Sequence, residues 1–197
     1  KEVSIELLED LVKIGTTAPS GTNSQGWNFI ILPTRKEVEE LGRMTAEYYR
    51  KLNRMARNPL LRVLVKLVGG DSLGRYYRNY HESVEEALKE WDEKGIDRLF
   101  HGATAAILVT GSTEASCPAE DALLASQNIL LAAHTMGLGS CLIGFVVEAM
   151  RRDNGLNSMA GVSADEKIYS VIALGYPALQ YRRFAQRKIV SPRLLSL

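Results

Sequence analysis

Short polar residues are concentrated between Pro19 and Gly26, directly after an apolar segment. They supply hydroxyls and side-chain amides, on Ser20, Thr22, Asn23, Ser24 and Gln25. Each amide offers both a donor and an acceptor, so the run suits a flat heteroaromatic ligand with several ring nitrogens and carbonyls. Residues of these types also form Asx and ST turns where a helix stops. Chemistry alone therefore predicts either a ligand-binding loop or an ordinary turn.

Two tyrosines form a second candidate site. Tyr76 and Tyr80 are four residues apart, a spacing that places both rings on one face of a helix. Such rings can stack on a planar substrate, and they can equally serve as half-buried packing. The neighbouring His81 has no partner at metal-ligand spacing, and we expect it at the surface. We expect no metal site.

Positive charge gathers in a tract over residues 48–70, which contains no Asp or Glu. Its cations are Arg50, Lys51, Arg54, Arg57, Arg62 and Lys66. The tract fits a nucleic-acid stripe, a membrane-surface helix, or a helix pair whose basic side chains extend over an apolar pocket as a lid. Pro59 and the Gly69-Gly70 pair interrupt it, which favours the helix pair over one continuous interfacial helix.

A second basic tract is the tail from Ala178 to Leu197, which also lacks Asp and Glu. Its cations include Arg183, Arg187 and Lys188. Arginine side chains hold phosphate through two parallel hydrogen bonds, so the tail could bind a phosphate. A basic end can also be simply solvated, and the residues alone leave both interpretations open.

Hydrophobic spacing predicts the elements that carry these residues. Apolar residues at helical spacing predict helices over residues 5–14, 36–55, 120–136 and 147–152. Apolar runs bounded by Gly or Pro predict strands over residues 27–32, 105–109, 139–143 and 168–174. We expect residues 154–164 to form a loop. The polar run then lies between the first helix and the first strand.

The bulk properties are those of an ordinary globular protein. The 197 residues are 46% hydrophobic and 24% charged, which predicts a single domain over residues 1–197. The net charge of +1 predicts no general attraction to nucleic acid or to anionic membranes. Two isolated cysteines and no long apolar run favour a cytoplasmic protein without a membrane span. Hydrolase, kinase and Rossmann motifs are absent from the sequence.

Four stretches resemble, in the same order, motifs of the flavin-dependent nitroreductase family. Residues 18–29 (APSGTNSQGWNF) are similar to the family pattern A-P-S-x-x-N-x-Q-P-W-x-F, with Gly26 in place of the proline. The printed sequence does not include the Arg-x-Ser-x-Arg-like segment that precedes the first helix in the family. The three later stretches are Phe100 to Ala103, Glu120 to Gly139, and Ala173 to Pro177.

The resemblance implies an α+β fold with three layers, in which helices flank a mostly antiparallel sheet. It implies an intertwined homodimer whose C-terminal segments exchange and add to the partner's sheet, with FMN at the interface. Pro19, Ser20, Gly21 and Asn23 would line the FMN from one subunit.

Further site residues follow from the same resemblance. Leu142, Ile143 and Gly144 would pass the reactive edge of the flavin ring. Arg187 would hold the ribityl phosphate, with Arg183 or Lys188 as a second contact. The flavin N5 atom would carry the chemistry, so no catalytic side chain is expected. Residues 36–99 are more divergent and would form a helical lid that shapes the substrate pocket.

These features predict an FMN-dependent oxidoreductase that takes hydride from NADH or NADPH in a ping-pong mechanism. Its acceptors would be nitroaromatics, quinones or similar small planar molecules. One alternative is a non-catalytic flavin-binding protein, or a reductase coupled to a ferredoxin partner. Another is a nucleic-acid or membrane-surface binder that uses residues 48–70.

Overall fold

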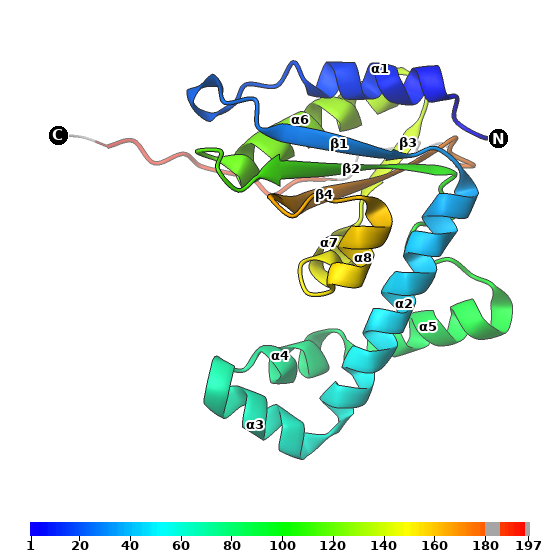
Figure 1. Cartoon of the computed structure of the whole chain (residues 1–197), viewed down its shortest axis with the longest axis vertical. Coiled ribbons are helices and arrows are strands. Elements are labelled where there is room, and N and C mark those ends of the chain that lie inside the picture. Colours follow the sequence, from blue (N-terminus) through cyan, green and yellow to red (C-terminus); the bar gives the residue numbers. More distant parts are fainter. Residues whose placement is uncertain (180–185, 196–197) are drawn as a thin grey trace.

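Four strands in the described part of the chain form one antiparallel sheet with the order β1-β2-β4-β3 (Figure 1). The structure is a computed structural model and describes residues 1–179 and 186–195. The strands are β1 (Trp27–Leu32), β2 (Ala105–Ser112), β3 (Gly139–Leu142) and β4 (Glu166–Gly175). A β-bulge interrupts the β2–β4 pairing, at the step from Val109 to Thr110. All four predicted strands are present.

Helices cover both faces of the sheet and make three layers (Figure 1). In β2, Ala105, Ile107 and Val109 pack on the face covered by α1 (Ile5–Gly15) and α6 (Pro118–Thr135). The alternate residues Ala106 and Leu108 pack on the opposite face. That face is covered by α2 (Arg35–Arg57), α7 (Gly144–Met150) and α8 (Asn154–Ala160). Side chains of one strand alternate between faces, so the apolar first part of β2, residues 105–109, serves both cores.

The predicted loop over residues 154–164 is wrong, because this segment begins with α8. Asp153 caps the helix, and its Oδ1 accepts a hydrogen bond from the Gly155 amide at 2.8 Å. Leu156 and Ala160 are four residues apart and both buried. Gly161 ends the helix in the left-handed conformation with a φ of 75°. Two buried residues are too few for a clear periodic signal.

The region between β1 and β2 is mainly helical. After the long α2, it continues as α3 (Pro59–Gly69), α4 (Ser72–Asn79) and α5 (His81–Lys94), which together project from the sheet (Figure 1). The tip is poorly buried: α3 has no buried residue, and Leu67 and Val68 are largely exposed. We call α2 to α5 the helical insert.

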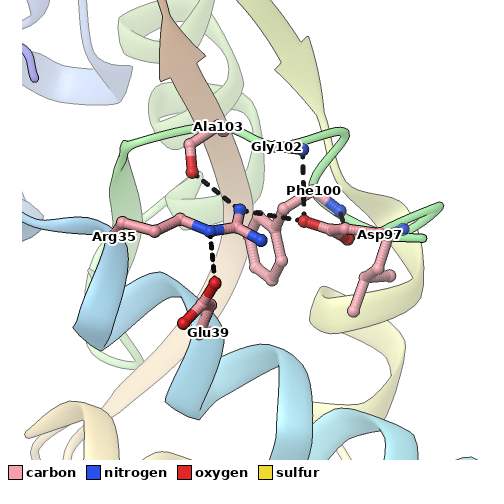
Figure 2. A network of polar contacts seen from close by, with 7 residues as sticks. Arg35, Glu39, Asp97, Phe100, Gly102 and Ala103 are labelled. Carbon is pink, nitrogen blue, oxygen red and sulfur yellow. Dashed lines mark hydrogen bonds and ion pairs between the residues drawn. The ribbon is translucent and has the colours of Figure 1, made fainter. Parts of the chain in front are cut away.

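An ion pair joins the two ends of the helical insert (Figure 2). Arg35 begins α2, and its Nη1 lies 2.9 Å from Asp97 Oδ2 and donates to the Ala103 carbonyl at 2.9 Å. Asp97 also accepts backbone amides from Phe100 at 2.8 Å and Gly102 at 3.2 Å. The side chain of Asp97 is only 8% exposed. The pair therefore closes the insert at the point where the chain returns to the sheet.

Burial and hydrogen bonding act in opposite directions on Asp97. Burial by itself raises the pKa of the carboxyl group, but the amides of Phe100 and Gly102 and the Arg35 guanidinium outweigh it. The pKa of Asp97 therefore lies below its usual range, and the group is a charged anchor at neutral pH.

Candidate functional site

The polar loop between α1 and β1 has an unusual backbone. Its centre is the short 3-10 turn η1 (Gly21–Asn23), and Thr22, Asn23 and Gln25 have φ values of 54°, 56° and 49°. Left-handed conformations cost non-glycine residues on the order of 1–3 kcal/mol each and persist only where the surroundings enforce them. The surrounding structure therefore fixes the conformation of this loop, which is more than the simple end of a helix.

Side chains within the loop enforce that conformation. The Gln25 amide donates to Ser20 Oγ at 3.0 Å, and Gln25 Nε2 donates to Asn23 Oδ1 at 3.0 Å. The second bond occupies the side-chain carbonyl of Asn23, while Pro19 and Asn23 remain exposed. The hydroxyl and amide groups that the sequence singled out thus serve first to shape the loop.

A buried carboxylate at the start of α6 holds the loop from outside. Asp121 is 2% exposed, and its Oδ1 accepts the Gly21 amide at 2.8 Å while its Oδ2 accepts Ser24 Oγ at 3.3 Å. A side chain at Gly21 would meet Ser116 Oγ at 2.7 Å, so the loop approaches α6 closely. Sequence reasoning missed Asp121, although an Asp in the first turn of a helix with small residues was a usable signal.

A second candidate surface surrounds the junction of β3 and α7. A cavity of about 890 Å³ lies between this junction and the helical insert. Leu142 and Gly144 line it, and so do Tyr76 and Tyr80, which the sequence placed in the substrate pocket. Ile143 is buried beneath. A Cβ atom at Gly144 would meet nothing within 4 Å, so the backbone there is open to a planar group.

Aromatic rings form one wall of this cavity. Tyr76 and Tyr80 stack with ring centroids 6.3 Å apart and an interplanar angle of 30°. Tyr49 stacks on Tyr76 at 6.3 Å, and Phe145 meets Tyr49 edge-on at 5.5 Å and Tyr80 edge-on at 5.9 Å. Sequence reasoning named Tyr76 and Tyr80 but missed Tyr49 and Phe145, because those come from elements far from α4 in the chain.

Two of the tyrosine hydroxyls donate to protein groups. Tyr49 Oη donates to the Phe145 carbonyl at 2.9 Å, and Tyr76 Oη donates to Asn53 Oδ1 at 2.6 Å. Burial is the main cause that raises the pKa of both phenols above the ordinary value. Both groups are therefore neutral at physiological pH. Charge at the cavity comes instead from Arg75 and from the Glu148–Arg152 ion pair.

The polar loop and the β3–α7 junction lie far apart in one chain. Strand β1, which follows the loop, and strand β3 are the two edges of the sheet. Three strand spacings separate them, about 14 Å in total. Asp121 places the loop beside α6, whereas α7 covers the opposite face. A single flavin ring therefore cannot lie against both segments of the same protomer.

Residues 186–195, the longest described part of the basic tail, lie outside the layered body (Figure 1). Arg187 and Lys188 are exposed, and neither is among the residues that line the cavity. Arg183, the other predicted phosphate contact, lies outside the described residues. Residues 186–195 belong to no strand, so exchange of the C-terminal segment stays a prediction. His81 differs from expectation, because its side chain is only 14% exposed and packs beside Tyr77 and Glu85.

The described residues include no helix long and apolar enough to cross a membrane. Among the same residues, no group of three or more His, Cys, Asp or Glu side chains could hold a metal ion. The donor set instead suits an uncharged aromatic ring system, because backbone amides, side-chain amides and aromatic faces predominate. The loop and the junction at Gly144 therefore fit the heteroaromatic ring of FMN.

Several known proteins are similar to this chain. A protein of Archaeoglobus fulgidus named "Putative NADH dehydrogenase/NAD(P)H nitroreductase" is 25% identical over 182 residues, which cover 90% of this chain and 76% of that protein. The iodotyrosine deiodinase of Thermotoga neapolitana is 23% identical over 190 residues, which cover 93% and 84%.

Solved structures confirm the predicted three-layer α+β fold. A nitroreductase with bound FMN from Bacteroides fragilis has a TM-score of 0.66 at 20% identity, covering 100% of this chain and 89% of that chain. The model of the nitroreductase family matches residues 1–176, which include the polar loop, the cavity and every described strand. The resemblance seen in the four motifs is thereby confirmed, and the chain belongs to the nitroreductase family.

Proposed function

We propose that the protein is an FMN-dependent oxidoreductase that uses NADH or NADPH and reduces small planar acceptors by a ping-pong mechanism. When bound, FMN supplies the redox chemistry, in which hydride is accepted from the nicotinamide and electrons are then delivered to the second substrate. The observation that carries the proposal is the strained polar loop held by the buried Asp121, in a chain of the nitroreductase family.

The chain's own residues have binding and positioning roles. Pro19, Ser20, Gly21 and Asn23 would contact the flavin ring through exposed loop groups whose geometry is set before binding. Preorganised amides stabilise developing negative charge because they need no rearrangement. Leu142, Ile143 and Gly144 would run along the ring at the cavity, where the open backbone at Gly144 permits close approach.

The phosphate would be held by the tail. Arg187 is the first candidate, and Arg183 and Lys188 are the second. An arginine is suited to this role because its planar guanidinium binds phosphate oxygens in pairs. Residues 186–195 lie outside the body of their own protomer, so the phosphate contact would be made at an interface (Figure 1).

The separated half-sites support a homodimer. The loop of one protomer and the β3–α7 junction of a second copy could enclose one flavin, whereas one protomer cannot supply both sides. The outer face of α6 exposes Leu123, Leu124 and Leu131, at 51%, 45% and 58%. Exposed apolar side chains on one helix are typical of a subunit contact.

The helical insert would act as the lid of a single domain over residues 1–197. Its α2 and α4 already contribute tyrosines to the aromatic wall of the cavity that Leu142 and Gly144 also line. A planar acceptor would stack between this wall and the flavin, since aromatic faces favour offset stacking. Excluding water from this space strengthens the electrostatic contacts inside.

The deciding experiment is visible spectroscopy of the purified protein with FMN, before and after anaerobic NADH and NADPH. A flavin spectrum that bleaches supports the proposal, and the more rapid reductant identifies the nicotinamide. Asn23→Ala should weaken FMN binding, with Asn79→Ala, on a different helix, as the matched control. A protein that binds no FMN, or whose bound FMN neither nicotinamide reduces, would contradict the proposal.

A further inference from the structure

A chain of hydrogen bonds runs from the aromatic wall of the cavity into the helical insert. Tyr76 Oη donates to Asn53 Oδ1 at 2.6 Å, and Asn53 Nδ2 donates to Glu85 Oε2 at 3.1 Å. Asn53 is a buried polar residue, only 4% exposed. The three residues come from α4, α2 and α5, so the chain of hydrogen bonds connects three helices of the insert.

The carboxylate at the end of this chain determines its direction. An ionised carboxylate only accepts hydrogen bonds, and Glu85 forms an ion pair with the guanidinium of Arg57. The other group facing it is His81, whose Nε2 lies 3.8 Å away. Asn53 must therefore turn its NH₂ group toward Glu85, which leaves its carbonyl oxygen toward Tyr76. Tyr76 must in turn donate its only proton to Asn53.

The consequence at the cavity is a tyrosine oxygen that can accept but cannot donate. Tyr49 is in the same condition, because its hydroxyl donates to the Phe145 carbonyl at 2.9 Å. Of the two phenols, Tyr49 is only 5% exposed, so Tyr76 is the one that offers a lone pair to a bound molecule. Nitro and quinone oxygens are acceptors themselves and gain nothing there, whereas an O–H or N–H group would be paired.

We propose that Asn53 and Glu85 position Tyr76 so that the cavity selects planar substrates bearing a hydroxyl or amino donor. The inference rests on the proposed function only in taking this cavity as the acceptor site. Tyr76 contacts the substrate, and Asn53 and Glu85 act through it. The substrate class is thus narrowed from planar acceptors in general to aromatic acceptors that can donate a hydrogen bond.

The test compares two ligands that differ in one donor, 4-nitrobenzyl alcohol and 4-nitrobenzyl methyl ether. Their affinities for the oxidised, FMN-loaded protein are measured by calorimetry without nicotinamide, so that no turnover occurs. The alcohol should bind about three- to tenfold more tightly, the ratio that one neutral hydrogen bond provides. Tyr76→Phe should reduce the ratio to about one, since it removes only that oxygen.

Asn53→Leu separates positioning from packing. It frees the Tyr76 proton, which can then be donated to the ether oxygen, so the ether should bind more tightly than it does to the wild type. A packing defect alone would weaken the binding of both ligands. Tyr77→Phe is the matched control, because Tyr77 lies on the same helix but does not line the cavity. It should leave the ratio unchanged.

Several results would overturn the inference. The first is equal affinity of the wild type for the two ligands, and the second is no binding of either ligand. The third is an affinity ratio that Tyr76→Phe leaves intact, provided that the variant has native near-ultraviolet circular dichroism. This test can be told apart from the test of the proposed function, because it uses no nicotinamide. A protein that retains the ratio but is never reduced by NADH or NADPH would refute the oxidoreductase and leave this selectivity standing. In steady-state assays of an active enzyme, the preference should appear in KM rather than kcat.

Discussion

Replacing Asp97 with asparagine tests the joint at the base of the helical insert. Asp97 Oδ1 accepts amides from Leu99 and Phe100, and Oδ2 accepts Gly102 and Arg35. All of these partners are donors (Figure 2 shows most of them). An asparagine can turn its oxygen to one side only, so its NH₂ group must face donors on the other. The change is nearly isosteric and removes a charge without leaving a void.

The expected cost follows from these contacts. Hydrogen bonds to charged groups contribute about 1.5–3 kcal/mol each, and breaking a fully buried ion pair costs about 3–5 kcal/mol. Arg35 is 28% exposed and keeps its contacts with Glu39 and the Ala103 carbonyl, so the lower end of the range for an ion pair applies. We expect a loss of about 3 kcal/mol, or about 6–12 °C in Tm for a chain of this length.

The assay is thermal unfolding at fixed protein and FMN concentrations, because ligand and subunit binding both shift Tm. Asp92→Asn is the matched control, since it breaks the exposed Arg50–Asp92 pair and should cost about 0–1 kcal/mol. The reasoning is refuted if Asp97→Asn lowers Tm no more than Asp92→Asn does.

Acid pH gives a second readout of the same residue. The folded-state pKa of Asp97 is depressed, so its stabilisation is complete above the unfolded value of about 3.9 and is lost as pH falls through the folded value. Urea unfolding should therefore show the largest difference between wild type and Asp97→Asn near neutral pH. The difference should shrink below about pH 4. A constant difference down to pH 3 would contradict this.

Three other changes probe the proposed cofactor site and assembly. Asp121→Ala should raise the Kd for FMN about tenfold by releasing the loop amide of Gly21, with the exposed Glu120→Ala as control, measured by flavin fluorescence titration. Arg187→Ala should lower the FMN retained on purification, whereas Arg193→Ala should not, and an unchanged content would remove Arg187 from the phosphate role. Leu131→Asp should shift the protein toward monomer in analytical ultracentrifugation and reduce bound FMN, and a stable dimer would exclude this face of α6 from the interface.

Local patterns predicted the main helices and strands well, whereas the layered arrangement followed from the family resemblance. Strand β1 was predicted with its observed bounds, and the helix predicted over residues 120–136 corresponds to α6, because both patterns need only neighbouring residues. The short α8 was missed because its stability comes from Asp153 and two packed side chains rather than from periodicity. Helix type and strand period are local properties, whereas caps and packing partners are not.

The candidate site was predicted only in part for the same reason. The polar loop could be read from residue types, but its shape depends on Asp121, 100 positions away from Gly21. Tyr76 and Tyr80 were recognised from their spacing, but Tyr49 and Phe145 join them only after α2 and α7 fold against α4. The direction of the Tyr76 hydroxyl depends on a carboxylate of α5. Such non-local partners determine chemistry that a motif does not contain.

The basic tract over residues 48–70 shows how a non-local partner changes the meaning of a local pattern. In the folded chain, Arg50 pairs with Asp92 at 2.5 Å, and Arg57 pairs with Glu85. Both of these carboxylates lie on the acidic helix α5. Arg62 lies 4.2 Å from the centroid of the Tyr77 ring. These cations are half of a contact between helices of the insert, so the tract carries less free charge than its sequence suggests. That arrangement favours the helix pair beside an apolar cavity over a nucleic-acid stripe, because phosphate binding would have to compete with carboxylates already in place.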